Sequence, residues 1–346
     1  MTCTAVHNNS ALLAADLGDV RAQFGALVSA CGVYDLSLRA KIQITGSDRI
    51  RWLNGMVTNN IRDLAVGQGV YAFLLNPQGH ILGDLYAYNR GDSLTIDTAQ
   101  SEAQKLLTTF DHYIIMDDVE VSNISAKLVA IGIAGPNTRA VLHAATIAVP
   151  ALELLQFVEM TWQSVDLTVI CGDNASLESY ELWLAPDQVR SVWDALTKSG
   201  ATPTGRAALE LLRIASGTPR YGQDIRERDL PQETEQQRAL HFSKGCYIGQ
   251  EIVERIRSRG NVHRKFTGFE VQGSLPAVGA KIQADGRDVG EITSVATLPG
   301  ALGERPVALG YLRREFATPG KQVQTEGAQL SVATLPFAGI FQRESL

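Results

Sequence analysis

Cysteine is scarce in this chain, and the few cysteines lie far apart. The four are Cys3, Cys31, Cys171 and Cys246, and no two of them form a C-x-x-C pair. This spacing excludes a zinc ribbon and a local cysteine cage for an iron–sulphur cluster. Free thiols are typical of a reducing compartment, so the sequence predicts a cytoplasmic protein.

Long apolar segments, a basic leader and an excess of positive charge are also missing. No apolar run approaches the roughly 20 residues that span a bilayer. The first Lys or Arg is Arg21, so we expect neither a membrane segment nor a targeting peptide. The chain carries 31 Lys and Arg against 37 Asp and Glu, a net charge of −6. This acidic balance, without an aromatic platform, argues against direct nucleic-acid binding.

The composition that is present belongs to a folded globular protein. Of 346 residues, 45% are hydrophobic and 20% are charged, which is enough for a sizeable core and about two domains. Residues 33–260 mix strand-like runs with segments of helical spacing. From about Lys265, short strands separated by Gly- and Pro-containing turns predict a small all-β barrel or sandwich. The predicted fold class is therefore α+β with a β cap.

The predicted parts are an N-terminal helix or tail over 1–32, an α+β body of two subdomains over 33–260, and a C-terminal barrel over 261–346. The N-terminal helix is expected around Leu12–Leu27. Predicted strands of the body are Lys41–Ile44, Tyr71–Leu75, Leu82–Tyr88, Ser93–Ile96, Lys127–Ala134 and Tyr180–Leu184. Predicted helix starts are a capping box at Ser101, Pro136, a cap at Asp187, and Ala207. Predicted barrel strands are Phe266–Val271, Lys281–Ala284, Glu291–Ala296 and Val307–Tyr311.

The densest candidate for chemistry is the octapeptide Lys244, Gly245, Cys246, Tyr247, Ile248, Gly249, Gln250 and Glu251. Glycines on both sides of Cys246 let the backbone bend tightly or approach a ligand. Lys244 stands two residues from Cys246 and could favour its thiolate form. A glycine-rich turn around a small buried thiol is the alternative. His241 and His263 are near in sequence, but nothing places either beside the sulphur.

Asp84 is a second candidate, at the head of an apolar strand after the turn Asn76–Gly79. A carboxylate there is either solvated at the strand end or buried and paired, because an unpaired buried one is too costly. His80 is interpreted as a loop residue, since no second His, Cys or Glu stands at ligand spacing. The sequence therefore predicts no metal site.

Glu181 is the third candidate, because it alternates with apolar residues in a predicted strand. On a half-buried strand it shares a face with Ser179 and Trp183. A carboxylate and an indole on one face suit a flat heterocycle, with Trp183 stacking on the ring and Glu181 pairing with its N–H groups. The alternative is the solvent face of a sheet.

Arginines form the last group of candidates. Arg206 and Arg213 flank an apolar stretch, where a guanidinium at a pocket rim could pair with a ligand carboxylate; plain surface arginines are the alternative. Further on, we expect Arg255, Arg257 and Arg259 to line one face of a strand. Such a basic face could meet phosphates or an acidic partner protein.

These segments, in this order, resemble the YgfZ folate-binding proteins, relatives of the glycine cleavage system T-protein, an aminomethyltransferase. The strongest match is Lys244–Glu251, which looks like the family signature. Leu212–Gly222 is similar to the family's RIEAGxPRxG stretch. Asn54–Asn59, Asn76–Leu85, Asp117–Val119 and Gly135-Pro136 also follow the family's order, so the resemblance covers roughly residues 30 to 340.

This resemblance implies a T-protein-like three-domain ring with a C-terminal β-barrel and a central channel that binds tetrahydrofolate. It places the pterin-reading glutamate on Glu181, the folate-contacting arginine on Arg206 and the aspartate essential to aminomethyl transfer on Asp84. The T-protein branch carries a second aspartate where this chain has Gly83. That departure argues against transferase activity.

Two functions follow from the resemblance. The first is a tetrahydrofolate-binding accessory protein, not itself an aminomethyltransferase, which supports assembly or repair of iron–sulphur enzymes, including a tRNA-modifying one, through Cys246 and the channel. The alternative is a folate-dependent aminomethyltransferase or demethylase that acts through Asp84. The octapeptide and Gly83 favour the first. A scaffold that docks a partner through its basic stretch is a third possibility.

Overall fold

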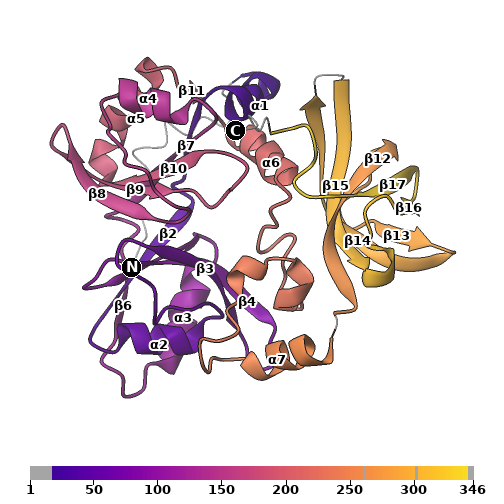
Figure 1. The fold of residues 1–346 in the computed structure, drawn as a ribbon, viewed down its shortest axis with the longest axis horizontal. Coiled ribbons are helices and arrows are strands. Elements are labelled where there is room, and N and C mark those ends of the chain that lie inside the picture. Colours follow the sequence, from indigo (N-terminus) through magenta and orange to yellow (C-terminus); the bar gives the residue numbers. More distant parts are fainter. Residues whose placement is uncertain (1–17, 261, 301–302, 342–346) are drawn as a thin grey trace, which may run out of the picture. The chain divides into compact units, whose positions relative to one another are not determined.

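The computed structural model describes residues 18–260, 262–300 and 303–341. The chain divides into two compact units (Figure 1). The first contains the residues up to Ala72 together with Leu85–Ala208, and the second contains Phe73–Asp84 together with the residues from Leu209 on. The domain boundaries expected after residues 32 and 260 stay predictions.

One sheet of the first unit has six strands in the order β11-β1-β7-β10-β9-β8. Their bounds are Gly32–Asp35 for β1, Val129–Ala134 for β7, Phe157–Trp162 for β8, Val165–Cys171 for β9, Ser179–Leu184 for β10 and Thr202–Pro203 for β11. Helices α4 (Thr138–Ala144) and α5 (Val189–Lys198) contribute Val141, Leu142, Val192, Trp193 and Leu196 to its apolar core. Alternation along β10 sends Leu182 into this core and Glu181 to the opposite face.

The other sheet has five strands in the order β3-β4-β5-β2-β6. Their bounds are Arg39–Thr45 for β2, Gly69–Leu75 for β3, Ile81–Asn89 for β4, Leu94–Ala99 for β5 and Glu120–Asn123 for β6. Helices α2 (Arg49–Met56) and α3 (Ala103–Tyr113) lie in this part of the chain, with α3 against β6, whereas α1 (Val20–Ser29) packs against β1 and β11 of the six-stranded sheet. The body strands that the sequence predicted are confirmed, with ends that differ by a few residues.

The second unit contains a closed barrel in the order β12-β15-β14-β13-β16-β17. The strands are β12 Arg264–Gly273, β13 Lys281–Ala284, β14 Arg287–Gly300, β15 Gly303–Arg313, β16 Gln322–Thr325 and β17 Ala328–Ala333 (orange to yellow in Figure 1). Phe269, Ile292, Leu312 and Leu330 are fully buried members of its core. The barrel and its first four strands are confirmed, whereas β16 and β17 are short and half-polar and were not predicted.

One predicted strand is a helix. Arg255, Arg257 and Arg259 belong to α7 (Gln250–Arg259), not to a strand. Residues two apart lie on roughly opposite sides of a helix, so Arg255 and Arg257 form no common basic face. Arg255 pairs with Glu251 and Arg257 with Glu254. Such pairs at three- and four-residue spacing favour a helix, and this signal outweighs the alternation of charge.

Several predicted helix starts were also wrong. Helix α3 begins after Glu102, which makes no side-chain capping bond, so the capping box at Ser101 is absent. Pro136 precedes α4, whose N-cap is Asn137. Asp187 lies in a short 3-10 turn, Pro186–Gln188, before α5. Of the predicted N-terminal helix, α1 from Val20 on is seen, while residues 12–17 lie outside the described residues.

The remaining connection between body and barrel is a long stretch of turns. It begins after α6 (Arg206–Ala215), which confirms the helix predicted at Ala207, and it includes the 3-10 turns Pro231–Thr234 and Gln237–Ala239. Within the parts of the chain that the structure covers, none of the helices combines the length and apolar character that a membrane span needs.

Candidate functional site

The face of the first unit that carries Glu181 contains a buried ion cluster. Lys41 on β2 stands directly opposite Asp97 on β5, and its Nζ lies 2.6 Å from Asp97 Oδ1. The two side chains are 0% and 1% exposed. Arg39 Nε reaches Asp97 Oδ2 at 2.6 Å. One buried carboxylate therefore faces two cations, and this excess positive charge favours a second carboxylate nearby.

Trp183 connects this pair to Glu181. The Lys41 ammonium lies 4.3 Å from the centroid of the Trp183 ring, a cation–π contact, and the Arg90 guanidinium lies 5.7 Å from it. The indole Nε1 donates a hydrogen bond to Glu181 Oε2 at 2.8 Å. Trp183 is completely buried, so its ring is not presented to a ligand as the stacking interpretation requires. Its observed place is that of a side chain that orients Glu181.

Glu181 is the partly exposed end of the cluster. Its Oε1 accepts no hydrogen bond from any residue that the structure describes. Burial raises the pKa of the Glu181 carboxyl, and the negative charge of Asp97 raises it further, whereas Lys41 and Arg39 act to lower it. The cluster thus ends in a carboxylate that Trp183 orients through one oxygen, while the other oxygen accepts no hydrogen bond from the described residues.

Tyr34 completes the surroundings of Glu181. Gly132 on β7 is paired with Tyr34 on one side and with Glu181 on the other. A Cβ at position 132 would lie 2.0 Å from Tyr34 Cε2, so the tyrosine ring lies across this glycine. Burial, together with the charge of Glu181, raises the pKa of Tyr34, which keeps its phenol protonated as a hydrogen-bond donor.

Glu181 was predicted from its strand pattern, whereas its neighbours Tyr34, Lys41 and Asp97 were not. A usable signal was present, because Lys41 stands between the apolar Ala40 and Ile42 of β2, and Asp97 is the one charged residue of β5. What the sequence does not contain is the register that sets the two strands side by side.

Asp84 and Arg206 have simpler surroundings. Asp84 is the fourth residue of β4, not its first, and it is partly exposed on the same face of the strand as Leu82 and Tyr86. Arg206 is the first residue of α6 and is exposed. Each keeps a charged group accessible, and the roles expected for both stay predictions.

The octapeptide lies in the second unit, packed against the turn after β3. Gly249 has φ +79°, and a Cβ there would lie 2.6 Å from the Asn76 carbonyl oxygen, so this close approach requires glycine. Lys244 is buried with its ammonium 4.7 Å from the Tyr247 ring centroid. Cys246 is exposed. The alternative of a small buried thiol is therefore wrong, while thiolate formation promoted by Lys244 stays a prediction.

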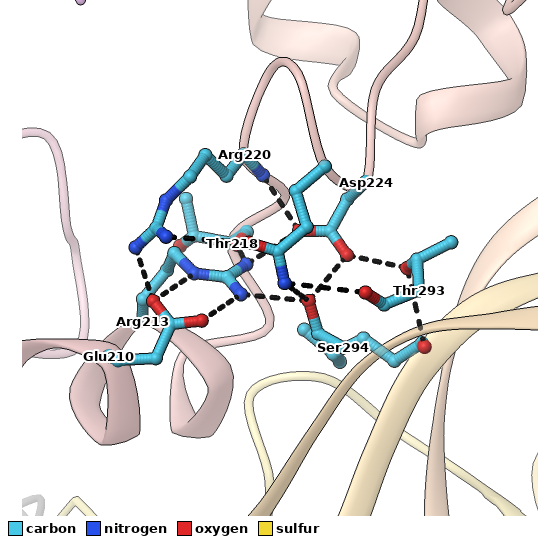
Figure 2. A network of polar contacts seen from close by, with 9 residues as sticks. Glu210, Arg213, Thr218, Arg220, Asp224, Thr293 and Ser294 are labelled. Atoms are coloured by element: carbon cyan, nitrogen blue, oxygen red, sulfur yellow. Dashed lines mark hydrogen bonds and ion pairs between the residues drawn. The ribbon is translucent and has the colours of Figure 1, made fainter. Parts of the chain in front are cut away.

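A second polar network in the same unit fastens α6 and the following loop to the barrel (Figure 2). Asp224 is fully buried and accepts hydrogen bonds from Thr293, Ser294, Arg213 and the Arg220 backbone. Arg213 also contacts both oxygens of Glu210, the Thr218 carbonyl and Ser294. Arg213 is thus occupied within the protein, which contradicts its prediction as a pocket-rim arginine.

Comparisons with known proteins fit this architecture. An aminomethyltransferase from Halothermothrix orenii is 29% identical over 90% of this chain and 89% of its own. An aminomethyltransferase from Lysinibacillus sphaericus is 28% identical over 94% and 91%. The crystal structure of glycine cleavage system aminomethyltransferase T from Bartonella henselae matches 96% of this chain and 92% of its own, with a TM-score of 0.85 at 23% identity. The T-protein-like fold is therefore shown.

Two family models match the chain itself. The model of the GCVT N-terminal domain matches residues 17–244, and the model of the glycine cleavage T-protein C-terminal barrel domain matches residues 264–337. The second range coincides with the closed barrel, and the first contains both sheets and the cluster around Glu181. Because these matches cover most of the sequence, the chain belongs to the glycine cleavage T-protein family.

Proposed function

We propose that this chain binds tetrahydrofolate or a related reduced folate, and that Glu181 recognises the pterin. The observation that carries the proposal is a partly exposed glutamate with one carboxylate oxygen held by Trp183, while the other oxygen accepts no hydrogen bond from the described residues. A pterin presents a ring N–H and an amino group side by side, and a carboxylate accepts hydrogen bonds from such a pair. Tyr34 adds a neutral phenol beside it. These residues fit the ligand that the family resemblance implies.

The first candidate activity is folate-dependent aminomethyl transfer or a related one-carbon transfer. The relatives named above carry the name aminomethyltransferase, and this favours the activity over the accessory role, which the octapeptide and Gly83 favour. Asp84 supplies the accessible carboxylate that the reaction needs. It would accept a proton or stabilise positive charge on the transferred group.

The second candidate is the accessory role for iron–sulphur enzymes, together with membership of the YgfZ branch. Two observations favour it: the exposed Cys246 within the octapeptide, and Gly83 in place of a second aspartate beside Asp84. Folate binding is common to both candidates, with the exposed Arg206 available to pair with a carboxylate of the folate tail.

The binding proposal is tested by titrating tetrahydrofolate into the wild type and Glu181→Gln. The amide keeps the shape but loses charge-assisted hydrogen bonds worth about 1.5–3 kcal/mol, so the affinity should fall roughly 10- to 150-fold. Glu153→Gln, the same change at an exposed position of the same unit, should bind like the wild type. Equal affinity of Glu181→Gln and the wild type would remove Glu181 from the site.

The two activities are separated by an ammonia-release assay with an aminomethyl-lipoyl protein as donor. Aminomethyl transfer predicts release that depends on added tetrahydrofolate and is lost in Asp84→Asn. The accessory role predicts folate binding without release, and rescue of iron–sulphur enzyme activity in cells that lack the protein. Release that continues in Asp84→Asn would exclude the role proposed for this aspartate.

A further inference from the structure

We propose that the buried pair Lys41–Asp97, acting next to Trp183, sets the charge and the aim of Glu181 and thereby fixes the pH range in which folate binds. The inference rests on the proposed folate site and deepens it. Lys41 and Asp97 are positioning residues in this account, since both are buried and neither is placed to touch a ligand.

The geometry forms a continuous chain of contacts. The Asp97 carboxylate holds the Lys41 ammonium at 2.6 Å. That ammonium lies 4.3 Å from the Trp183 ring, and the indole N–H is bonded to Glu181 Oε2. Trp183 therefore cannot turn without disturbing the ion pair on one side and the carboxylate on the other. The buried Lys41–Asp97 pair is coupled in this way to the carboxylate of the partly exposed Glu181.

The charges around Glu181 are balanced only when its carboxylate is ionised. The groups that face it are Tyr34 on β1, Arg39 and Lys41 on β2, Tyr88 on β4 and Asp97 on β5. Burial raises the pKa of both tyrosines, so they stay neutral. The charged groups are then the cations Arg39 and Lys41 and the anion Asp97. An ionised Glu181 supplies the second negative charge that balances the two positive ones. Without these cations, burial alone would favour the protonated acid.

The sign of each substitution follows from this balance. Folate binding needs the ionised carboxylate, so it is present above the raised pKa of Glu181 and lost as the pH falls through it. Removing the negative charge of Asp97 lowers that pKa and extends binding to lower pH. Removing the positive charge of Lys41 raises it and ends binding at higher pH. A merely structural pair would weaken binding in both variants without moving the midpoint in opposite directions.

The experiment is the tetrahydrofolate dissociation constant of the full chain as a function of pH, in the absence of oxygen. We expect the midpoint to shift by about one pH unit downward in Asp97→Asn and by a similar amount upward in Lys41→Met. Lys127→Met, at an exposed lysine of the same unit, should leave it unchanged. Shifts in the same direction, or no shift, overturn the inference while the folate site stands.

A buried ion left without its partner can prevent folding. Arg39→Gln therefore provides a second test, because Arg39 is 27% exposed and its charge also acts to lower the pKa of Glu181. Its midpoint should move upward, as in Lys41→Met, and an unchanged or lower midpoint contradicts the inference. If the wild type binds no folate at any pH, the proposed function itself fails, which is a different result.

Discussion

Two buried ion clusters in this protein contain the same kinds of side chain. They differ in whether their polar atoms all find partners within the protein. In the second unit, Asp224 and Arg213 use their polar atoms on partners within the protein (Figure 2). In the first unit, Asp97, Lys41 and Trp183 lead to Glu181, whose Oε1 accepts no bond from the described residues. A network whose polar atoms are all paired within the protein stabilises the fold. A network with one unpaired acceptor can also accept a hydrogen bond from a ligand.

The contrast also separates stability from binding. A substitution inside the Asp224–Arg213 network leaves buried donors without acceptors, so it should lower the stability of the fold. A substitution of Glu181 in the other cluster changes a side chain that is partly exposed. It should therefore reduce the affinity for the ligand more than the stability of the fold.

Asp224→Asn should be the most damaging single change. The amide keeps the volume but turns an N–H group toward donors, and it leaves the guanidinium of Arg213 with one carboxylate fewer. Breaking a buried pair of this kind costs about 3–5 kcal/mol, measured as the free energy of unfolding in denaturant. The exposed control Asp288→Asn should cost little. A stable Asp224→Asn variant would mean that the network does not hold this region.

Gly249→Ala and Gly245→Ala test the same distinction inside the octapeptide. Both glycines have positive φ, but only the Cβ at 249 would collide, at 2.6 Å, with the Asn76 carbonyl. Strain at such backbone angles costs about 1–3 kcal/mol, and the collision should make the loss of thermal stability larger for Gly249→Ala. If the two variants lose equal stability, the close packing of the octapeptide on this turn is not important.

Cys246→Ser should have the smallest effect on the fold. The thiol is exposed, so the thermal midpoint should change by less than about 2 °C, and tetrahydrofolate affinity should stay the same. The accessory role predicts a sharp fall in iron–sulphur enzyme activity in cells complemented with this variant. Full complementation would leave any role of the octapeptide to other residues, and a large fall in the midpoint would make Cys246 structural.

Much of the fold could be predicted from the sequence, because local patterns determine which segments form strands. Period-two alternation predicted β2 and the apolar run predicted β3, and evenly spaced turns predicted the barrel. Helix α7 was missed because alternating arginines imitate a strand, while its stabilising pairs with Glu251 and Glu254 are a helical signal.

The site was only half predictable for a physical reason. Glu181 could be predicted because a charged residue within an apolar strand is costly to bury and therefore indicates a specific partner or ligand. Its partners Lys41 and Asp97 are distant in sequence and meet only through the pairing of β2 with β5. Trp183 shared a face with Glu181 as expected, but its complete burial comes from an apolar cluster with residues such as Tyr88 and Phe157, which the sequence does not bring together.

The most direct test of the central claim is a crystal structure of the protein with bound tetrahydrofolate. We predict that the pterin donors lie within hydrogen-bond distance, about 2.7–3.2 Å, of Glu181 Oε1, with the Lys41–Asp97 pair intact behind it. A pterin bound elsewhere would contradict the claim. One such place is the cavity of about 360 Å³ in the second unit, lined by residues such as Lys265, Phe266 and Leu335.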